Sequence, residues 1–304
     1  MIPQFPQFKS IEVDDRKAVE SHTHRFLPYS DFNFTSLWAW DTNGERKMSE
    51  LNSNLVVRFT DYRTHEPFLS FLGTGEPEQT ARTLIEFCRA EGLPQILRLM
   101  PEDSIGGLLS GDFQIDEDID NFDYVYSIPD LASLQGNSYM SKRGRANKFK
   151  RTFPEAHPEV IDLTDKALQV GIQEIIDIWE RKKIADGKSY EVEHERAAVR
   201  RLCETADSHS LSAMAVSLRG KMIAFSLEEI LPEQYTICHF WKADSSHPGI
   251  FDFLMQEKAR HLQTQGALYM NYEQDLGIPT LRTAKHSFRP VKFLKKYNIG
   301  YRQN

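Results

Sequence analysis

A short segment near the C-terminal end carries the residues best suited to chemistry. Residues 271–277 read Asn-Tyr-Glu-Gln-Asp-Leu-Gly and follow an apolar stretch that predicts a strand. Ligands of open α/β sheets bind at such strand ends. Glu273 and Asp275 could there accept a proton or bind an ammonium group. The competing interpretation is structural, with Asp275 capping the next helix and Glu273 pairing with Arg282.

A second candidate is a basic segment in the middle of the chain. Residues 139–151 contain six lysines and arginines and no acid, and their spacing predicts a helix with a cationic face. Such a face suits the phosphates of a lipid head group, a tRNA or a cofactor. The other interpretation is a solvated helix that offsets the acidic run at 112–123. The candidate phosphate ligands are Lys142, Arg143, Arg145, Asn147 and Lys148.

The third candidate is the stretch Cys238-His239-Phe240-Trp241-Lys242, which predicts a strand. Strand alternation places His239 and Trp241 on one face and Lys242 on the other. His239 could act as a general base, although a lone histidine in a strand is more often a satisfied core residue. Trp241 is expected in the core or as a wall of a pocket. Further binding candidates are Lys242, Asn271, Arg282 and Lys285.

Several motifs of nucleotide and metal enzymes are absent from the sequence. It contains no P-loop, no GxGxxG, no HExxH and no GxSxG. The loop at 245–249, Ser-Ser-His-Pro-Gly, precedes an expected helix and has one glycine and a proline that donates no N–H. It therefore lacks the glycine-rich form that holds a pyrophosphate at a helix N-terminus. We expect no metal site and no tightly bound cofactor.

Length and composition bound the class of protein. A chain of 304 residues with 40% hydrophobic residues is long enough for two globular domains. It has no apolar run of membrane-spanning length and no secretory signal, so we expect a cytoplasmic protein. Its three cysteines stand far apart and predict buried thiols. A net charge of -7 with local basic stretches indicates a local anionic partner and not general DNA binding.

The order of expected elements predicts a fold. The first half contains strands at 54–60 and 67–73, a helix from Glu76 to Gly92, and two further short strands. The second half contains two helices, three strands with a turn at Arg219-Gly220-Lys221, a helix, a strand, a short helix and closing strands. That order resembles the GNAT acyltransferase fold. We therefore expect an α+β chain with two mixed sheets flanked by helices, divided into a degenerate GNAT-like domain at 1–129 and a site-bearing GNAT-like domain at 130–304.

These segments together resemble the bacterial family related to the C-terminal domain of phosphatidylglycerol lysyltransferase. The resemblance spans nearly the whole chain, and its motifs are specific only as a set. The matching segments are Tyr29 to Trp38, Lys142-Arg143, Asn147 to Phe149, Ile223 to Ser226, His239-Phe240, Lys242-Ala243, Asn271 to Gly277, Leu281-Arg282 and Lys285.

The resemblance implies a tandem GNAT-like fold, also seen in Fem-type peptidyltransferases, and an activity. In the lysyltransferase, this domain moves an aminoacyl group from a charged tRNA to a lipid hydroxyl. A membrane-embedded flippase domain precedes it there, and this sequence shows none, so lipid would be reached by peripheral contact. We expect transfer of an aminoacyl or acyl group to an amine or hydroxyl, with aminoacyl-tRNA or acyl-CoA as donor. The alternatives are an acetyl-CoA-dependent N-acetyltransferase and a non-catalytic module that binds an anionic ligand.

Overall fold

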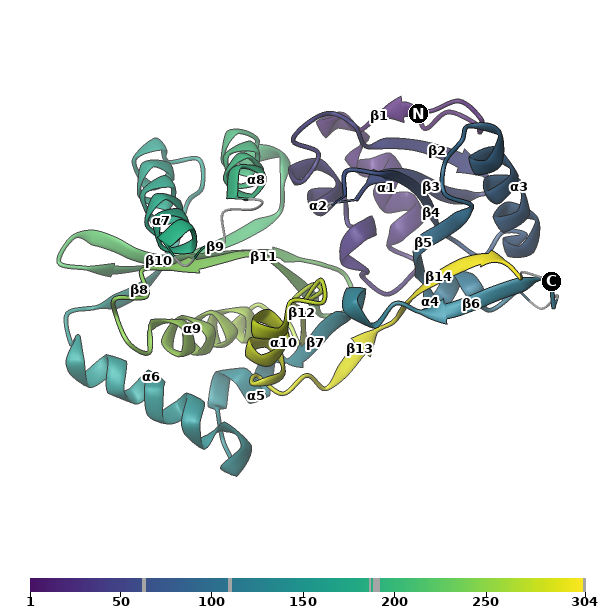
Figure 1. The fold of residues 1–304 in the computed structure, drawn as a ribbon. Helices are drawn as coiled ribbons and strands as arrows, with labels where there is room; N and C mark the ends of the chain where they lie inside the picture. The colour runs from purple at the N-terminus through teal and green to yellow at the C-terminus, as the bar shows by residue number, and fades with distance from the viewer. Residues whose placement is uncertain (62–63, 109–110, 186, 188–191, 303–304) are drawn as a thin grey trace. The chain divides into compact units, whose positions relative to one another are not determined.

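The computed structural model describes residues 1–61, 64–108, 111–185, 187 and 192–302, and their contacts divide the chain into two units (Figure 1). Unit 1 comprises Met1–Asp123, Gln274–Pro279 and Phe293–Asn304, and unit 2 comprises Tyr124–Glu273 and Thr280–Lys292. The chain thus leaves unit 2 after Glu273, returns at Thr280 and ends in unit 1.

Unit 1 holds a four-stranded sheet, β1-β2-β3-β4, and a three-stranded sheet, β5-β14-β6. Helix α3 buries Ala81, Leu84, Ile85 and Cys88 in their core, as the i, i+3, i+4, i+7 spacing predicts. The elements are β1 (Lys9–Ser10), α1 (Arg16–Thr23), α2 (Phe34–Ala39), β2 (Lys47–Leu51), β3 (Asn54–Thr60), β4 (Pro67–Leu72), α3 (Pro77–Ala90), β5 (Ile96–Pro101), α4 (Glu102–Ile105), β6 (Phe113–Glu117) and β14 (Lys296–Tyr301).

Unit 2 is built on a seven-stranded sheet of order β13-β7-β12-β11-β10-β9-β8. Its elements are β7 (Asp123–Ser127), α5 (Ile128–Ser133), α6 (Met140–Thr152), β8 (His157–Ile161), α7 (Lys166–Ala185), α8 (Val192–Glu204), β9 (Leu211–Leu218), β10 (Lys221–Ile230), β11 (Tyr235–Ala243), α9 (Ile250–Thr264), β12 (Tyr269–Asn271), α10 (Pro279–His286) and β13 (Lys292–Leu294).

The helices of unit 2 cover both faces of this sheet. Helix α9 packs on one face and carries α5 and α6 on its outer side, whereas α7 and α8 lie on the opposite face (Figure 1). Strands β11 and β12 run parallel. The pairs β7–β12, β11–β10, β10–β9 and β9–β8 run antiparallel. The mixed α+β architecture expected from the sequence is confirmed.

Two irregularities of the central strands shape this sheet. Leu227 on β10 pairs with Phe240, but the next residue, Glu228, pairs with Cys238, so His239 is an extra residue and forms a β-bulge in β11. Strand β12 pairs with β11 only from Tyr235 to Ile237. Beyond that point, the chain after β12 bonds to β7 instead, through the N–H of Tyr272 and the carbonyl of Tyr124. Strands β11 and β12 therefore separate beyond Ile237, next to the bulge.

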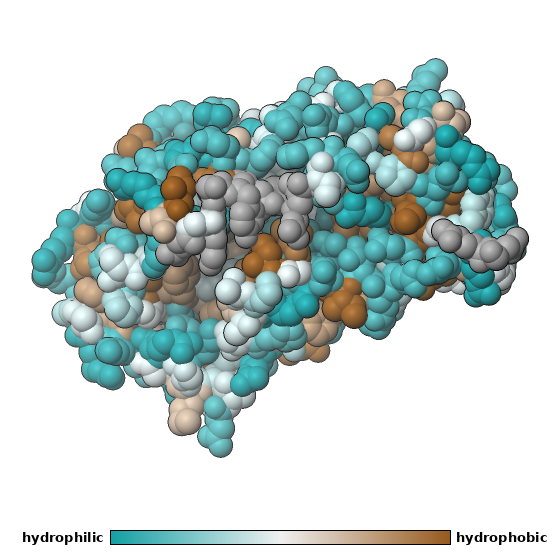
Figure 2. Space-filling view, in the orientation of Figure 1, coloured by the Kyte–Doolittle hydropathy of each residue, from teal (hydrophilic) through white to brown (hydrophobic). Residues whose placement is uncertain are grey.

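Local sequence signals place most elements correctly but miss some. The hairpin expected at Arg219-Gly220-Lys221 joins β9 to β10, with positive φ at Arg219 and Gly220, as a two-residue turn requires. Strand β2 and helix α1 were not expected. Among the described residues, no helix is long and apolar enough to cross a membrane. The face drawn in Figure 2 is mostly hydrophilic, with apolar residues interspersed.

Candidate functional site

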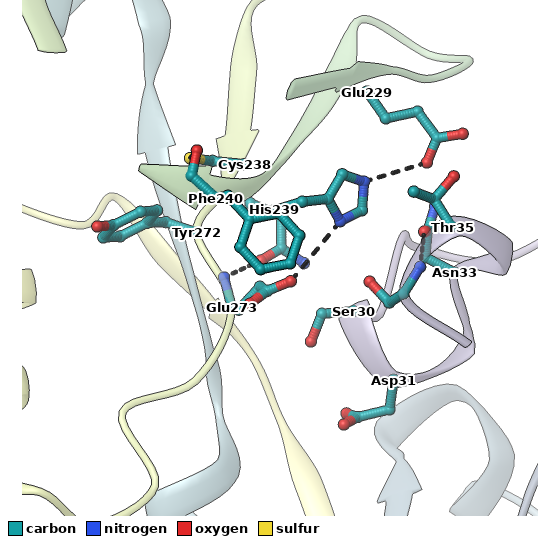
Figure 3. A network of polar contacts seen from close by, with 12 residues as sticks. Ser30, Asp31, Asn33, Thr35, Glu229, Cys238, His239, Phe240, Tyr272 and Glu273 are labelled. Atoms are coloured by element: carbon teal, nitrogen blue, oxygen red, sulfur yellow. Dashed lines mark hydrogen bonds and ion pairs between the residues drawn. The ribbon is translucent and has the colours of Figure 1, made fainter. Parts of the chain in front are cut away.

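His239 lies between two carboxylates on the face of the unit 2 sheet opposite α9. Its Nε2 is 3.4 Å from Oε2 of Glu229 on β10, and its Nδ1 is 3.8 Å from Oε1 of Glu273 after β12 (Figure 3). Burial alone would lower the pKa of His239, but hydrogen bonds and charges from Glu229 and Glu273 outweigh it and raise the pKa to about 9. The two carboxylates therefore favour the protonated imidazole, and a catalytic role for His239 stays a prediction.

Glu273 is the member of this triad that solvent reaches. Its side chain is 22% exposed, whereas the side chains of His239 and Glu229 are 1% and 2% exposed. Asn271 fixes the backbone beside it, because its side-chain oxygen accepts the N–H of Glu273 at 2.7 Å. Glu273 also has φ +53°, a backbone conformation rare outside glycine. The arrangement thus presents one carboxylate, held by a buried cation, at the opening between β11 and β12.

A second buried charge group lies on the α9 face of the same strands. Lys258 of α9 binds Glu228 at 2.9 Å and lies 3.0 Å from Sγ of Cys238, and all three are buried. Burial would lower the pKa of Lys258, but Cys238 and the Glu228 carboxylate raise it. Burial also raises the pKa of Cys238 to about 12, so the thiol is not a nucleophile at neutral pH.

The bulge overturns the expected alternation along β11. His239 and Trp241 were predicted to share a face, yet Cys238 and Trp241 both contact Lys258 on the α9 face. His239 instead contacts Glu229, the neighbour of Glu228 along β10. Because the bulge adds one residue, the side chains that follow it point to the opposite face from the one that strict alternation predicts. A period-2 pattern in the sequence does not reveal this change.

Asp275 lies in the segment that belongs to unit 1. Its side chain is buried and accepts the N–H of Gly277 at 2.9 Å, and its carbonyl accepts the N–H of Ile278 at 3.0 Å. These bonds hold the turn that precedes α10, and the capping interpretation of Asp275 also stays a prediction. A catalytic role for Asp275 stays a prediction.

Unit 1 has its own buried polar cluster, made by Ser30, Asp31, Asp123, Gln274 and Lys296. Lys296 is fully buried, binds Asp123 at 2.7 Å and also pairs with Asp31. Burial would lower the pKa of Lys296, but the two carboxylates raise it. The Ser30 Oγ lies 2.7 Å from Oδ1 of Asp123 and 2.9 Å from Oε1 of Gln274, within hydrogen-bonding distance of both. The cluster therefore anchors the residue that follows Glu273.

The cations of the basic helix α6 contact protein groups. Lys142 and Arg145 both bind Asp252 in the first turn of α9, at 3.3 Å and 2.6 Å. Arg143 donates to backbone carbonyls, among them that of Gly136 at 3.3 Å. Asn147 and Lys148 are exposed. The structure thus ties the first half of α6 to α9, and phosphate binding by its cations stays a prediction.

The remaining predicted ligands are distributed over unit 2. Lys242 binds Glu195 of α8 and lies 4.5 Å from the ring centre of Trp179. Lys285 is buried, donates to the carbonyl of Tyr272 and lies 4.5 Å from the ring centre of that tyrosine. Arg282 is half-buried on α10. Lys285 thus contacts Tyr272, the residue before Glu273.

The loop before α9 is folded on itself. Within it, the N–H of Ser246 donates to the side chain of Asp244, and the N–H groups of His247 and Ile250 donate to loop carbonyls. A Cβ on Gly249 would lie 2.5 Å from the carbonyl of Arg145, so α6 covers this glycine closely. The Asp252 carboxylate also occupies the first helical turn. Little of the loop is left to bind a pyrophosphate.

Sequence reasoning missed Glu228, Glu229 and Lys258. The signal was present as two adjacent carboxylates inside the otherwise apolar strand 222–230, and a lysine between Leu254 and Leu262 on the apolar face of a helix. Charges at such positions are costly to bury unless they are paired, so each predicts a partner across the fold.

Comparison with known proteins identifies relatives. The family model described as phosphatidylglycerol lysyltransferase, C-terminal, matches residues 24–300. A conserved protein of unknown function from Bacteroides thetaiotaomicron is 27% identical, with a TM-score of 0.83 over 99% of this chain and 100% of that one. No curated protein matches the sequence.

Two solved structures extend the likeness of the fold. The C-terminal DUF2156 domain of a protein described as a lysylphosphatidylglycerol synthetase from Agrobacterium fabrum is 12% identical, with a TM-score of 0.66 over 96% of this chain and 92% of that chain. L-PGS from Bacillus licheniformis is also 12% identical, with a TM-score of 0.65 over 100% of this chain and 94% of that chain. The chain therefore shares the fold of these two structures over nearly its whole length.

Proposed function

The chain belongs to the family of phosphatidylglycerol lysyltransferase C-terminal domains, and we propose that it transfers an aminoacyl group from a charged tRNA to an amine or hydroxyl acceptor. The observation that carries the proposal is the partly exposed Glu273, held by buried His239 at the opening between β11 and β12. An acyltransferase needs a proton acceptor at the reacting centre, and Glu273 is the accessible carboxylate there.

The proposed reaction uses Glu273 as general base and then as general acid. Its carboxylate takes the proton of the acceptor hydroxyl or amine as that oxygen or nitrogen bonds to the carbonyl carbon of the aminoacyl ester. The tetrahedral intermediate then breaks its bond to the ribose oxygen of the tRNA, and Glu273 returns the proton to that oxygen. His239 stays protonated and orients the carboxylate, and Glu229 holds the other imidazole nitrogen. The charges and protons balance without a further reactant.

The loop before α9 supports a tRNA donor over acetyl-CoA. Backbone N–H groups of Ser246, His247 and Ile250 are already bonded within the loop. A helix N-terminus that binds pyrophosphate needs free N–H groups. The exposed cations of α6, such as Lys148, remain accessible to a nucleic acid backbone.

The test is transfer of radiolabelled amino acids from a pool of charged tRNA. The acceptors would be vesicles containing phosphatidylglycerol and, in a parallel reaction, a peptide with free amino groups. We expect label to move to one acceptor, and Glu273→Gln to lower the rate at least 100-fold, the usual scale for loss of a general base. Glu159→Gln is the matched control because Glu159 is an exposed glutamate on edge strand β8.

Other outcomes would reject the proposal in distinct ways. Label transferred from acetyl-CoA and not from tRNA would replace the donor. Binding of charged tRNA without transfer to either acceptor would favour a non-catalytic module. Full activity of Glu273→Gln would remove Glu273 from the chemistry.

A further inference from the structure

The peptide group that joins Tyr272 to Glu273 is bound at both of its polar atoms. Its carbonyl oxygen accepts a hydrogen bond from the ammonium group of Lys285, and its N–H donates to the side-chain oxygen of Asn271 at 2.7 Å. The next carbonyl, that of Glu273, accepts the N–H of Tyr124 on β7 at 3.1 Å. Because peptide groups are planar, these bonds hold both planes beside the Cα of Glu273 and so fix the direction of its side chain.

This restraint matters because Glu273 has an unfavourable backbone conformation. Its φ of +53° lies in the left-handed region, which residues with a side chain adopt rarely and keep where neighbouring groups hold them. A freed peptide group would let Glu273 relax toward negative φ, and its side chain would then point elsewhere. In the structure, the carboxylate points toward His239, with Oε1 3.8 Å from Nδ1 (Figure 3).

Lys285 reaches this peptide group from a buried position. It lies in the last turn of α10 and is 5% exposed. Its Nζ lies 4.5 Å from the ring centre of Tyr272 and 5.6 Å from that of Tyr124, and both rings favour the cation. Its own carbonyl accepts the hydroxyl of Tyr126 on β7 at 2.9 Å, which fixes this end of α10 against the sheet. A hydrogen bond from a charged donor is about twice as strong as one between neutral groups.

The bond from Lys285 differs in origin from the other two bonds around Glu273. Asn271 is the last residue of β12, and Tyr124 lies on β7, the strand that pairs with β12. Those two contacts therefore come with the pairing of the sheet. Helix α10 lies outside the sheet, so the third contact depends on one long side chain that ends in a cation.

We propose that Lys285 is a positioning residue for Glu273, whose carboxylate it holds against His239 by binding the carbonyl of Tyr272. For its effect on catalysis this inference rests on the proposed function, but the placement of the carboxylate is measurable without any substrate. In this role Lys285 acts through the backbone of Glu273 and not on the reacting groups.

An NMR titration of the His239 ring protons tests the proposal. Glu273→Gln removes one of the two carboxylates that face His239 and sets the midpoint that results from its loss. Lys285→Met keeps the length of the side chain and removes its donor, so we expect the midpoint to fall by about one pKa unit or more, toward that of Glu273→Gln. Lys285→Gln, which is shorter and uncharged, should shift it the same way. Lys285→Arg keeps a cationic donor and should stay within about 0.5 unit of the wild type.

Lys292→Met is the matched control. The ammonium group of Lys292 lies 5.0 and 4.8 Å from the ring centres of Tyr235 and Tyr269, at the other end of β12. This variant removes a lysine from two tyrosine rings of the same sheet and leaves the bonds around Glu273 in place. Its His239 midpoint should equal that of the wild type.

Kinetics of the transfer reaction give a second readout. A displaced base slows the chemical step and leaves substrate binding unchanged. Lys285→Met should therefore lower kcat about 10- to 100-fold while KM stays within about 2-fold, and Lys292→Met should change neither constant by more than about 2-fold.

The inference is overturned if Lys285→Met and Lys285→Gln both keep the wild-type midpoint of His239. It is also overturned if Glu273→Gln keeps that midpoint, because the carboxylate then does not lie against the imidazole. Failure of both Lys285 variants to fold, or an equal shift in Lys292→Met, would assign Lys285 a general structural role instead.

The two readouts separate this inference from the proposed function. If the midpoint falls as expected but the wild type transfers no label, the positioning role stands and the proposed function falls. If the wild type transfers label and the Lys285 variants match it in midpoint and kcat, the proposed function stands and the inference falls.

Discussion

The raised pKa of His239 predicts that the stability of the protein depends on pH in a defined window. The pKa rises from 6.5 to about 9 because Glu229 and Glu273 bind the imidazolium. Each pKa unit corresponds to about 1.4 kcal/mol, so the difference is worth about 3 kcal/mol. The native state binds the proton more tightly than the unfolded chain does. This stabilisation is therefore complete below pH 6.5 and is lost as the pH rises through 9.

Two measurements check this prediction. An NMR titration of the His239 ring protons should give a midpoint near pH 9. The free energy of unfolding in urea should fall between pH 6.5 and 10 in the wild type. The fall should be about 3 kcal/mol larger than in His239→Gln. His157→Gln is the control, because His157 is exposed on β8, and its pH dependence should equal that of the wild type.

The reasoning is refuted by a midpoint at or below pH 7. It is also refuted if His239→Gln retains the same alkaline loss of stability as the wild type. In the first case the two carboxylates do not hold the proton, and His239 would again be available as a base.

Two further predictions concern the buried lysines. Lys258→Met leaves the Glu228 carboxylate buried without its cation and should destabilise the protein by about 3–5 kcal/mol in urea unfolding, and adding Glu228→Gln should restore much of that loss. Lys296→Met leaves both Asp31 and Asp123 without their lysine and should lower the free energy of unfolding by at least as much. In thermal unfolding, this loss of stability should be smaller at pH 5 than at pH 8. The reason is that burial raises the pKa of the Asp31 carboxyl, so acid favours its protonation.

Local sequence patterns predict the elements of this fold well where the pattern is strong. The apolar spacing of α3 and the turn at Arg219-Gly220 are short-range signals, and the structure bears them out. The segment 271–277 was singled out from residue types alone, and it supplies Glu273 to the triad and Gln274 to the cluster of unit 1.

What the sequence could not show depends on long-range pairing. The bulge at His239 arises from the register of β10 against β11, and a one-residue slip moves every following side chain to the other face. The partner of Lys142 is Asp252, 110 positions away, so the helix looked like a free cationic face. Glu273 and Asp275 look alike as strand-end carboxylates, yet Glu273 contacts His239 in unit 2, whereas Asp275 accepts the N–H of Gly277 in unit 1.

The two charge groups on β10 and β11 have different exposure, and this difference separates their roles. Glu228 and Glu229 are neighbours on opposite faces of one strand, and each binds a buried cation beside the bulge. In the Lys258–Glu228 pair, both side chains are 1% exposed, so it can only fix the geometry of the strands. In the other group, the buried His239 holds a carboxylate that is 22% exposed. Because reaction requires access and buried pairing requires exclusion of water, this difference supports the role proposed for Glu273, whereas the closed Lys258–Glu228 pair joins α9 to β10 beside the bulge.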